Sequence, residues 1–264
     1  MLLFFLLFTS GLGALTQDVY SIPSEILDSK QTDPAAKPEF TRDQFLLMRA
    51  IWDQDLDAAE HLLHNGLSPN FLFRLHPEDT FATPLGESIA DGNSQMATLC
   101  FKYGAQADFG EKEGAGALGR AVWNNDEAMV KELLKRGATV DARDDEGYTP
   151  LLVASYQTRD VKIIKLLIVA GADVKATSSK SQRTAIMLAA SNLNLEAVKL
   201  FLDFGVDPCA KDSSGETAID AADWGLLTKQ EKDTAKEQVR DTIVKLLQSR
   251  CVHLEKSVHL SSKL

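Results

Sequence analysis

Residues 147–173 have the sequence GYTPLLVASYQTRDVKIIKLLIVAGAD, which contains two features that recur along the chain. The first is the glycine near its end, which recurs at spacings of 38, 33, 34 and 34 residues. Its copies are Gly66, Gly104, Gly137, Gly171 and Gly205. A nearly constant period of this length predicts one supersecondary unit copied along an axis. A glycine just after a helix often adopts a positive φ, so each copy is expected to end a helix.

The second feature is Thr149-Pro150-Leu151, which lies in phase with the glycines. Related triplets begin at Thr83, Thr184 and Thr217. Threonine can cap the free N–H groups of a helix, and proline in the first turn has no N–H to leave unpaired. The period, the Thr-Pro-Leu triplet and the Gly-Ala-Asp sequence together resemble the ankyrin repeat. This resemblance implies pairs of helices joined by hairpin loops.

The second helix of each expected unit carries an apolar stripe at positions i, i+3 and i+4, as in Val130, Leu133 and Leu134. Such a stripe is too small to fold alone and must stack on its neighbours. We therefore expect an all-α solenoid of about six units over residues 39–250, with capping first and last units. The expected units are residues 41–73, 81–110, 114–143, 147–177, 182–211 and 215–250.

Two departures from the period are expected to shape the ends of the array. The longer first spacing predicts an extended hairpin between Phe71 and Phe81. The last unit is expected to end in a long helix over about 229–249, and Arg250 stands where a glycine would continue the array. Residues 251–264 are expected to form a C-terminal tail.

Residues 1–15 are apolar and uncharged, and residues 16–38 are expected to form a polar linker. The apolar run is too short to span a membrane and has the length of a signal-peptide core. No Lys or Arg precedes it, so a retained apolar extension that tethers the array to a membrane stays an alternative. A signal peptide predicts an extracytoplasmic protein, periplasmic or secreted.

The C-terminal tripeptide gives a competing prediction for localisation. Ser262-Lys263-Leu264 matches a peroxisomal targeting sequence, so a peroxisomal or cytoplasmic location is the alternative. The net charge of −10 would repel phosphate backbones, and nucleic acid is therefore not an expected partner.

The three cysteines suggest no disulfide framework. Cys100 aligns with the leucines of the second helices and is expected in the core. Cys209 and Cys251 fall near loops of adjacent repeats. Stacked units sit about 10 Å apart, beyond the roughly 7 Å Cα limit for a disulfide, so this spacing argues against a bond between them, and the sequence leaves their redox state open.

Two patterns resemble sites of chemistry but fit the repeat better. Gly114–Gly119 matches G-x-G-x-x-G, yet the preceding residues form an inter-repeat hairpin instead of the buried strand that dinucleotide binding requires. His61 and His64 lie three residues apart on a helix, but no further metal ligands converge on them. No catalytic residue, metal site or cofactor is expected.

One position of the repeat is rich in aromatic residues. Two residues after the small residue of each first helix stand Trp52, Ala90, Trp123, Tyr156, Ser191 and Trp224, which include every tryptophan of the chain. In the ankyrin family this position resembles a variable one on the concave side that often contacts ligands. The alternative interpretation is that the rings fill gaps between repeats, above all Trp52 and Trp224 at the two ends.

The resemblance therefore implies a non-enzymatic module that binds a protein or peptide through its groove and hairpin tips. The alternative is a regulatory or protective subunit, or an inhibitor, of a separate enzyme. No stable membrane span is expected, and the sequence predicts no oligomeric state. The candidate partner-binding residues are Trp52, Trp123, Asn124, Arg143, Asp145, Tyr148, Tyr156, Gln157, Asn192 and Trp224.

Overall fold

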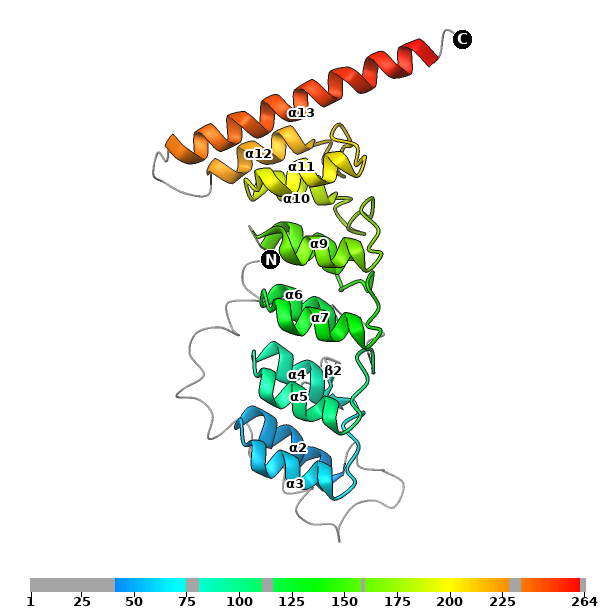
Figure 1. Cartoon of the computed structure of the whole chain (residues 1–264), viewed down its shortest axis with the longest axis vertical. Helices are drawn as coiled ribbons and strands as arrows, with labels where there is room; N and C mark the ends of the chain where they lie inside the picture. Colours follow the sequence, from blue (N-terminus) through cyan, green and yellow to red (C-terminus); the bar gives the residue numbers. More distant parts are fainter. Residues whose placement is uncertain (1–40, 75–80, 111–115, 158–159, 228–233, 262–264) are drawn as a thin grey trace.

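The computed structural model describes residues 41–74, 81–110, 116–157, 160–227 and 234–261. In these residues twelve helices stack as successive pairs into one elongated array (Figure 1). The predicted all-α solenoid is confirmed, and one helix pair falls in each expected unit, although the last helix runs past residue 250. The expected signal peptide, the polar linker and the tripeptide at residues 262–264 lie outside the described residues.

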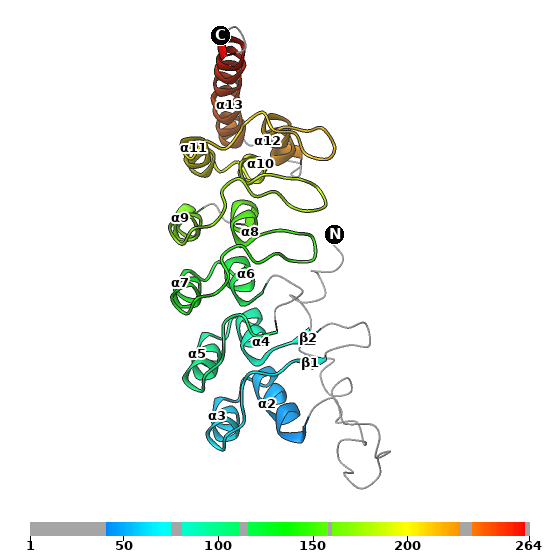
Figure 2. The same cartoon turned by 90° about the vertical axis from the view of Figure 1, so that its right-hand side faces the viewer.

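The helices form two rows, and the hairpin loops project from the side of the first-helix row (Figure 2). That inner row consists of α2 (Arg42–Trp52), α4 (Pro84–Ala90), α6 (Gly116–Trp123), α8 (Pro150–Gln157), α10 (Ala185–Ser191) and α12 (Ala218–Leu227). The outer row consists of α3 (Leu56–His64), α5 (Ser94–Lys102), α7 (Glu127–Lys135), α9 (Val161–Val169) and α11 (Leu195–Asp203). A longer helix, α13 (Thr234–Ser261), lies across the C-terminal end.

The helix boundaries follow the predicted capping chemistry. The side chain of Thr83 accepts a hydrogen bond from the N–H of Gly86 at the start of α4. The N-terminal cap of each outer-row helix is an Asp or Asn whose side chain accepts a backbone N–H, as Asp126 does at α7. After α9, Gly171 adopts a φ of +97°, which confirms the predicted left-handed turn.

The core runs along the array between the two helix rows. Val130 and Leu133 of the predicted stripe are fully buried, and Leu134 packs against the core from its edge. Cys100 is fully buried, as predicted, and this burial raises the pKa of its thiol to about 11. A smaller cluster around α2 and α3 forms the N-terminal end of the core.

The extended first hairpin begins as a short antiparallel pair, β1 (Phe73–Arg74) with β2 (Phe81–Ala82). The ring of Phe73 is buried and packs against Phe45 and Trp52, with centroid distances of 6.1 Å and 5.6 Å. The base of the hairpin therefore packs against two aromatic side chains of α2, those of Phe45 and Trp52. Residues 75–80 of the loop lie outside the described part.

The last helix is longer than predicted. The expected helix over residues 229–249 was wrong at its C-terminal end, because α13 continues to Ser261 through residues assigned to the tail. Arg250 supplies no left-handed glycine, and a helix without such a stop can continue. Ile243 and Leu247 are fully buried against the array, so this part of α13 closes the core.

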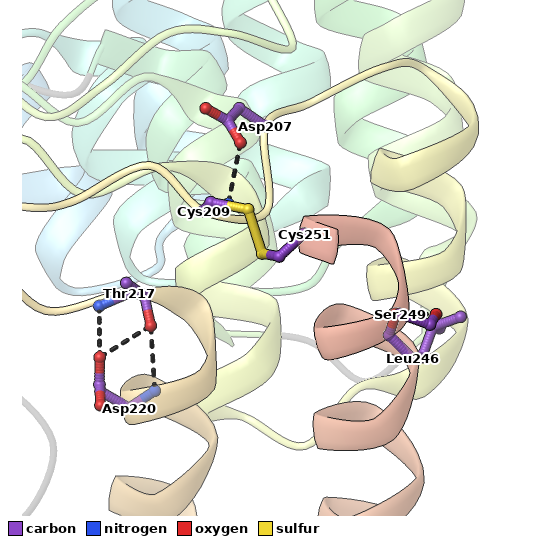
Figure 3. Close-up of a disulfide and its surroundings, with 7 residues drawn as sticks. All are labelled: Asp207, Cys209, Thr217, Asp220, Leu246, Ser249 and Cys251. Atoms are coloured by element: carbon purple, nitrogen blue, oxygen red, sulfur yellow. Dashed lines mark hydrogen bonds between the residues drawn. A yellow bond between two sulfur atoms is a disulfide. The ribbon is translucent and has the colours of Figure 1, made fainter. Parts of the chain in front are cut away.

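Cys209 and Cys251 form a disulfide, with 5.8 Å between their Cα atoms (Figure 3). The prediction of no bond between them was wrong. It assumed that both lay on stacked loops, whereas Cys251 lies on α13 beside the turn that holds Cys209. The carboxylate of Asp207 accepts the N–H of Cys209 and orders this turn. The bond fixes α13 to the turn after α11.

Within the residues that the structure describes, no helix is both long enough and apolar enough to cross a membrane.

Candidate binding groove

A hollow of about 430 Å³ lies where α8, α10 and α12 meet the hairpin loops that precede α10 and α12. We call it the C-terminal groove. Three consecutive copies of the aromatic position, Tyr156, Ser191 and Trp224, line it. The full lining comprises Tyr156, Gln157, Arg183, Met187, Ser191, Asn192, Asp212, Glu216, Thr217, Ala221 and Trp224.

Two aromatic side chains of the groove are open to solvent. Tyr156 is 48% exposed and Trp224 is 52% exposed, which is high for large apolar side chains. The small Ser191 lies between them in the register and leaves the space that the hollow occupies. Trp and Tyr are the residue types that most often dominate binding energy at protein interfaces.

The groove contains an ion pair between Arg183 and Asp212, and backbone hydrogen bonds hold the carboxylate of Asp212 in place. The Nε of Arg183 lies 3.6 Å from Oδ2 of Asp212, whose side chain is only 4% exposed. The other oxygen of Asp212 accepts the backbone N–H groups of Ser214 and Glu216. The buried carboxylate thus shapes the hairpin and orients the guanidinium.

Further acidic groups lie beside this pair. The side chain of Glu216 forms no ion pair with any other described residue of the chain. Thr217 donates from its hydroxyl and its backbone N–H to Asp220 at the start of α12, and these bonds, the backbone bond first, lower the pKa of the Asp220 carboxyl. Lys211 lies near enough to favour the same ionised form.

Four of the ten candidate residues come together in the C-terminal groove: Tyr156, Gln157, Asn192 and Trp224. Gln157 is exposed at the end of α8, and Asn192 forms the C-terminal cap of α10. Each of these two amides follows a copy of the aromatic position in the sequence, Tyr156 or Ser191. This part of the site was predictable from the repeat.

Trp52 and Asn124 make structural contacts elsewhere in the array. The indole Nε1 of Trp52 donates to Oε2 of Glu87 at 3.2 Å, and its ring meets Phe73 edge to face. The amide of Asn124 donates to the backbone oxygen of Ile89 at 2.6 Å, which joins α6 to the end of α4. These contacts agree with the interpretation that rings such as Trp52 fill gaps between repeats.

Trp123 is half-buried and packs against the main core. Tyr148 is also half-buried there, and its backbone N–H donates to Asp144. Arg143 donates through Nη1 to the backbone oxygens of Gly147 and Thr177, at 2.7 Å and 2.8 Å. These three candidates therefore stabilise the repeats and their hairpins.

Asp145 is exposed at a hairpin tip. Its neighbour Glu146 forms a 2.7 Å ion pair with Lys180 of the next hairpin. Partial burial raises the pKa of Asp144 in the same tip. The acidic tip is thus linked to the hairpin that bounds the C-terminal groove.

Seven residues of the lining are not among the ten candidates: Arg183, Met187, Ser191, Asp212, Glu216, Thr217 and Ala221. Met187 precedes Ser191 by four residues and Ala221 precedes Trp224 by three. Residues with those spacings share one face of a helix, so the register could have included both. The hairpin residues carry no comparable pattern, because their approach depends on how the loops fold back.

A second polar cluster lies on α4 and α6, near the N-terminal end. Glu87 is largely buried and lies 3.8 Å from Nη1 of Arg120. Desolvation, followed by repulsion from Glu87, raises the pKa of Asp91 to about 6, and Arg120 opposes this shift. Glu87 links this cluster to Trp52, whose indole N–H it accepts.

Among the described residues no group of three or more His, Cys, Asp and Glu side chains could hold a metal ion. His61 and His64 are exposed on α3.

A family model described as ankyrin repeats (3 copies) matches residues 47–144, 92–178 and 151–228. The human SH3 and multiple ankyrin repeat domains protein 2 is 33% identical over 97 residues, which are 36% of this chain and 5% of that protein. A putative ankyrin repeat protein of Rickettsia bellii is 28% identical over 120 residues, 44% of each chain. The potassium channel AKT1 of rice is 29% identical over 73 residues, 28% of this chain and 8% of the channel. The chain thus spans less than half the length of each of these relatives.

Proposed function

Because this chain belongs to the ankyrin-repeat family, whose model matches within residues 47–228, we propose that it is a non-enzymatic module that binds a protein or peptide in the C-terminal groove. Ankyrin repeats generally mediate protein–protein interaction. The observation that supports the site most directly is the pair of exposed aromatic side chains, Tyr156 and Trp224, on either side of Ser191.

The position of these rings favours binding over a packing role. The partly buried ring of Trp52, at the same repeat position, has partners within the array. Tyr156 and Trp224 instead present about half of their surface to solvent within a concave site. Exposed aromatic surface rimmed by polar groups is typical of protein interaction sites.

The test is affinity capture with the wild type and the Tyr156→Ala/Trp224→Ala double variant. Phe204→Ala is the matched control, since Phe204 is also 48% exposed but caps α11 in the outer row. We expect the double variant to lose the partner, the control to retain it, and both to unfold near the wild-type temperature. Retained capture together with a loss of stability in the double variant would refute the groove as the binding site.

The same experiment separates two forms of the function. A captured enzyme whose activity changes when the array is added back supports a regulatory, protective or inhibitory subunit. An unchanged activity supports a scaffold that only binds.

We propose further that the protein functions outside the cytoplasm. The apolar residues 1–15 support a signal peptide, and the disulfide between Cys209 and Cys251 is of a kind that persists in oxidising compartments. N-terminal sequencing of the mature protein and cell fractionation test this proposal. An uncleaved protein with three reduced cysteines in the cytoplasm or peroxisome would contradict it.

A further inference from the structure

We propose that the C-terminal groove selects a basic side chain, Arg or Lys, presented by an extended segment of the partner protein. This inference rests on the proposed function and adds the chemical class of the residue that the groove recognises. It follows from the charges, the aromatic walls and the floor of the groove.

The charges of the lining favour a cation. Arg183 is the one basic residue of the lining, and the buried carboxylate of Asp212 already engages it. Glu216 is left without an ion-pair partner among the described residues. An acidic partner residue would have to displace Asp212 and approach Glu216, whereas a basic residue meets an available carboxylate.

An apolar partner residue fits less well. It would cover Glu216 and remove its water without supplying a hydrogen-bond donor, which is unfavourable for a charged group. Asp220 adds a second negative charge one helical turn into α12, although Lys211 offsets it in part. The net charge of the chain, −10, also favours the approach of a basic segment.

The aromatic and apolar residues of the groove can contact both the charged group and the apolar stem of an Arg or Lys side chain. A guanidinium or ammonium group over the face of a Tyr or Trp ring is attracted by the negative ring face, and Tyr156 and Trp224 are both about half exposed in the groove. Arg and Lys carry apolar stems, which pack well on apolar surface. Met187 and Ala221 provide that surface in the groove.

An amide of the groove matches an extended chain. Gln157 lines the hollow and is exposed at the end of α8, and an amide side chain can donate to and accept from a peptide backbone. We therefore expect one basic side chain in the hollow and the neighbouring peptide backbone along the ends of α8 and α10.

The test is selection of a phage-displayed library of random dodecapeptides on the full chain, in parallel with the Tyr156→Ala/Trp224→Ala variant and the Phe204→Ala control. We expect the wild type and the control to enrich peptides with Arg or Lys at one fixed position, and the double variant not to enrich them. For a selected synthetic peptide, replacing that residue by norleucine should weaken binding about tenfold or more.

Glu216→Gln gives an independent readout, because it removes the charge and keeps the shape. We expect this variant to bind the selected peptide about fivefold or more weakly and with a smaller salt dependence. Its unfolding temperature should stay unchanged. Peptides that need both rings but carry acidic or purely apolar residues at the fixed position would overturn the basic preference and leave the proposed function intact. Peptides that bind the wild type and the double variant equally, or the absence of any enrichment, would overturn both.

Discussion

Reduction of the disulfide between Cys209 and Cys251 should loosen the C-terminal unit and leave the rest of the array folded. The bond closes a loop with a sequence separation of 42 residues, which contains α12 and most of the packed part of α13. For a loop of about 40 residues, chain entropy gives a stabilisation of about 4 kcal/mol at 25 °C. Because repeats interact mainly with their neighbours, the loss should appear first in that unit.

Hydrogen exchange followed by mass spectrometry measures the loss of stability in each repeat unit separately. In the Cys209→Ser/Cys251→Ser variant, and in the wild type with reductant, amides of α12 and α13 should exchange up to about a thousandfold faster, the equivalent of 4 kcal/mol. Amides of α4 to α7 should keep their protection. Reduction also leaves Cys100 in place, since that thiol is buried and unbonded in both states.

The unaltered protein supplies a control for the bond itself. Alkylation in denaturant without reductant should label one cysteine, Cys100, and alkylation after reduction should label all three. Equal exchange of α12 and α13 before and after reduction would show that packing of Ile243 and Leu247 alone holds the helix, and the entropic argument would be refuted. A uniform loss of protection along the array would instead refute the local character of the effect.

Three further predictions concern single residues of the array. The pKa of Asp91 is raised from 3.8 to about 6, so between these pH values the folded protein keeps a proton that the unfolded chain has lost. The free energy of unfolding should therefore fall as pH rises from 3.8 through 6. Asp91→Asn should remove that fall and raise the unfolding temperature above pH 6. Asn124→Ala should cost about 1 kcal/mol in urea unfolding, because it removes the amide that donates to the oxygen of Ile89, and an unchanged midpoint would contradict that role. Gly171→Ala should lower the free energy of unfolding by about 1 kcal/mol, and Gly171→Asn should lower it less. An added Cβ meets no atom within 4 Å, so the cost comes from the φ of +97° alone. Equal stability of the wild type and both variants would exclude that explanation.

The repeat made much of the inner architecture predictable from the sequence. The positive φ of Gly171, the burial of Cys100 and the shared register of Tyr156 and Trp224 all follow from a unit whose positions recur. Local chemistry decides each of these features, and the period copies it along the chain.

The C-terminal end was not predictable in the same way. The length of α13 and its direction depend on packing against α11 and α12, and no repeat position specifies them. The pairing of Cys209 with Cys251 depends in turn on that direction. Once a capping helix departs from the period, spacing in the sequence no longer gives distance in the structure.

The register also explains how the surroundings of the aromatic position differ between two similar places in the array. The array contains the order aromatic, small, aromatic twice, as Trp52, Ala90 and Trp123 and again as Tyr156, Ser191 and Trp224. In the first, Glu87 accepts from the indole of Trp52 and lies beside Arg120, so ionic side chains occupy the space.

Around Tyr156, Ser191 and Trp224, different residues occupy the repeat position of Glu87 and Arg120. Leu188 corresponds to Glu87, and Ala221 corresponds to Arg120. Leu188 is buried within α10, and Ala221 is too short to reach across the gap. Among the described side chains of the inner helices, none at this repeat position joins neighbouring units as Glu87 joins Trp52 to Arg120 in the first place. The groove is therefore a consequence of two substitutions within one repeated position, and the exposed rings on either side are what a partner can contact.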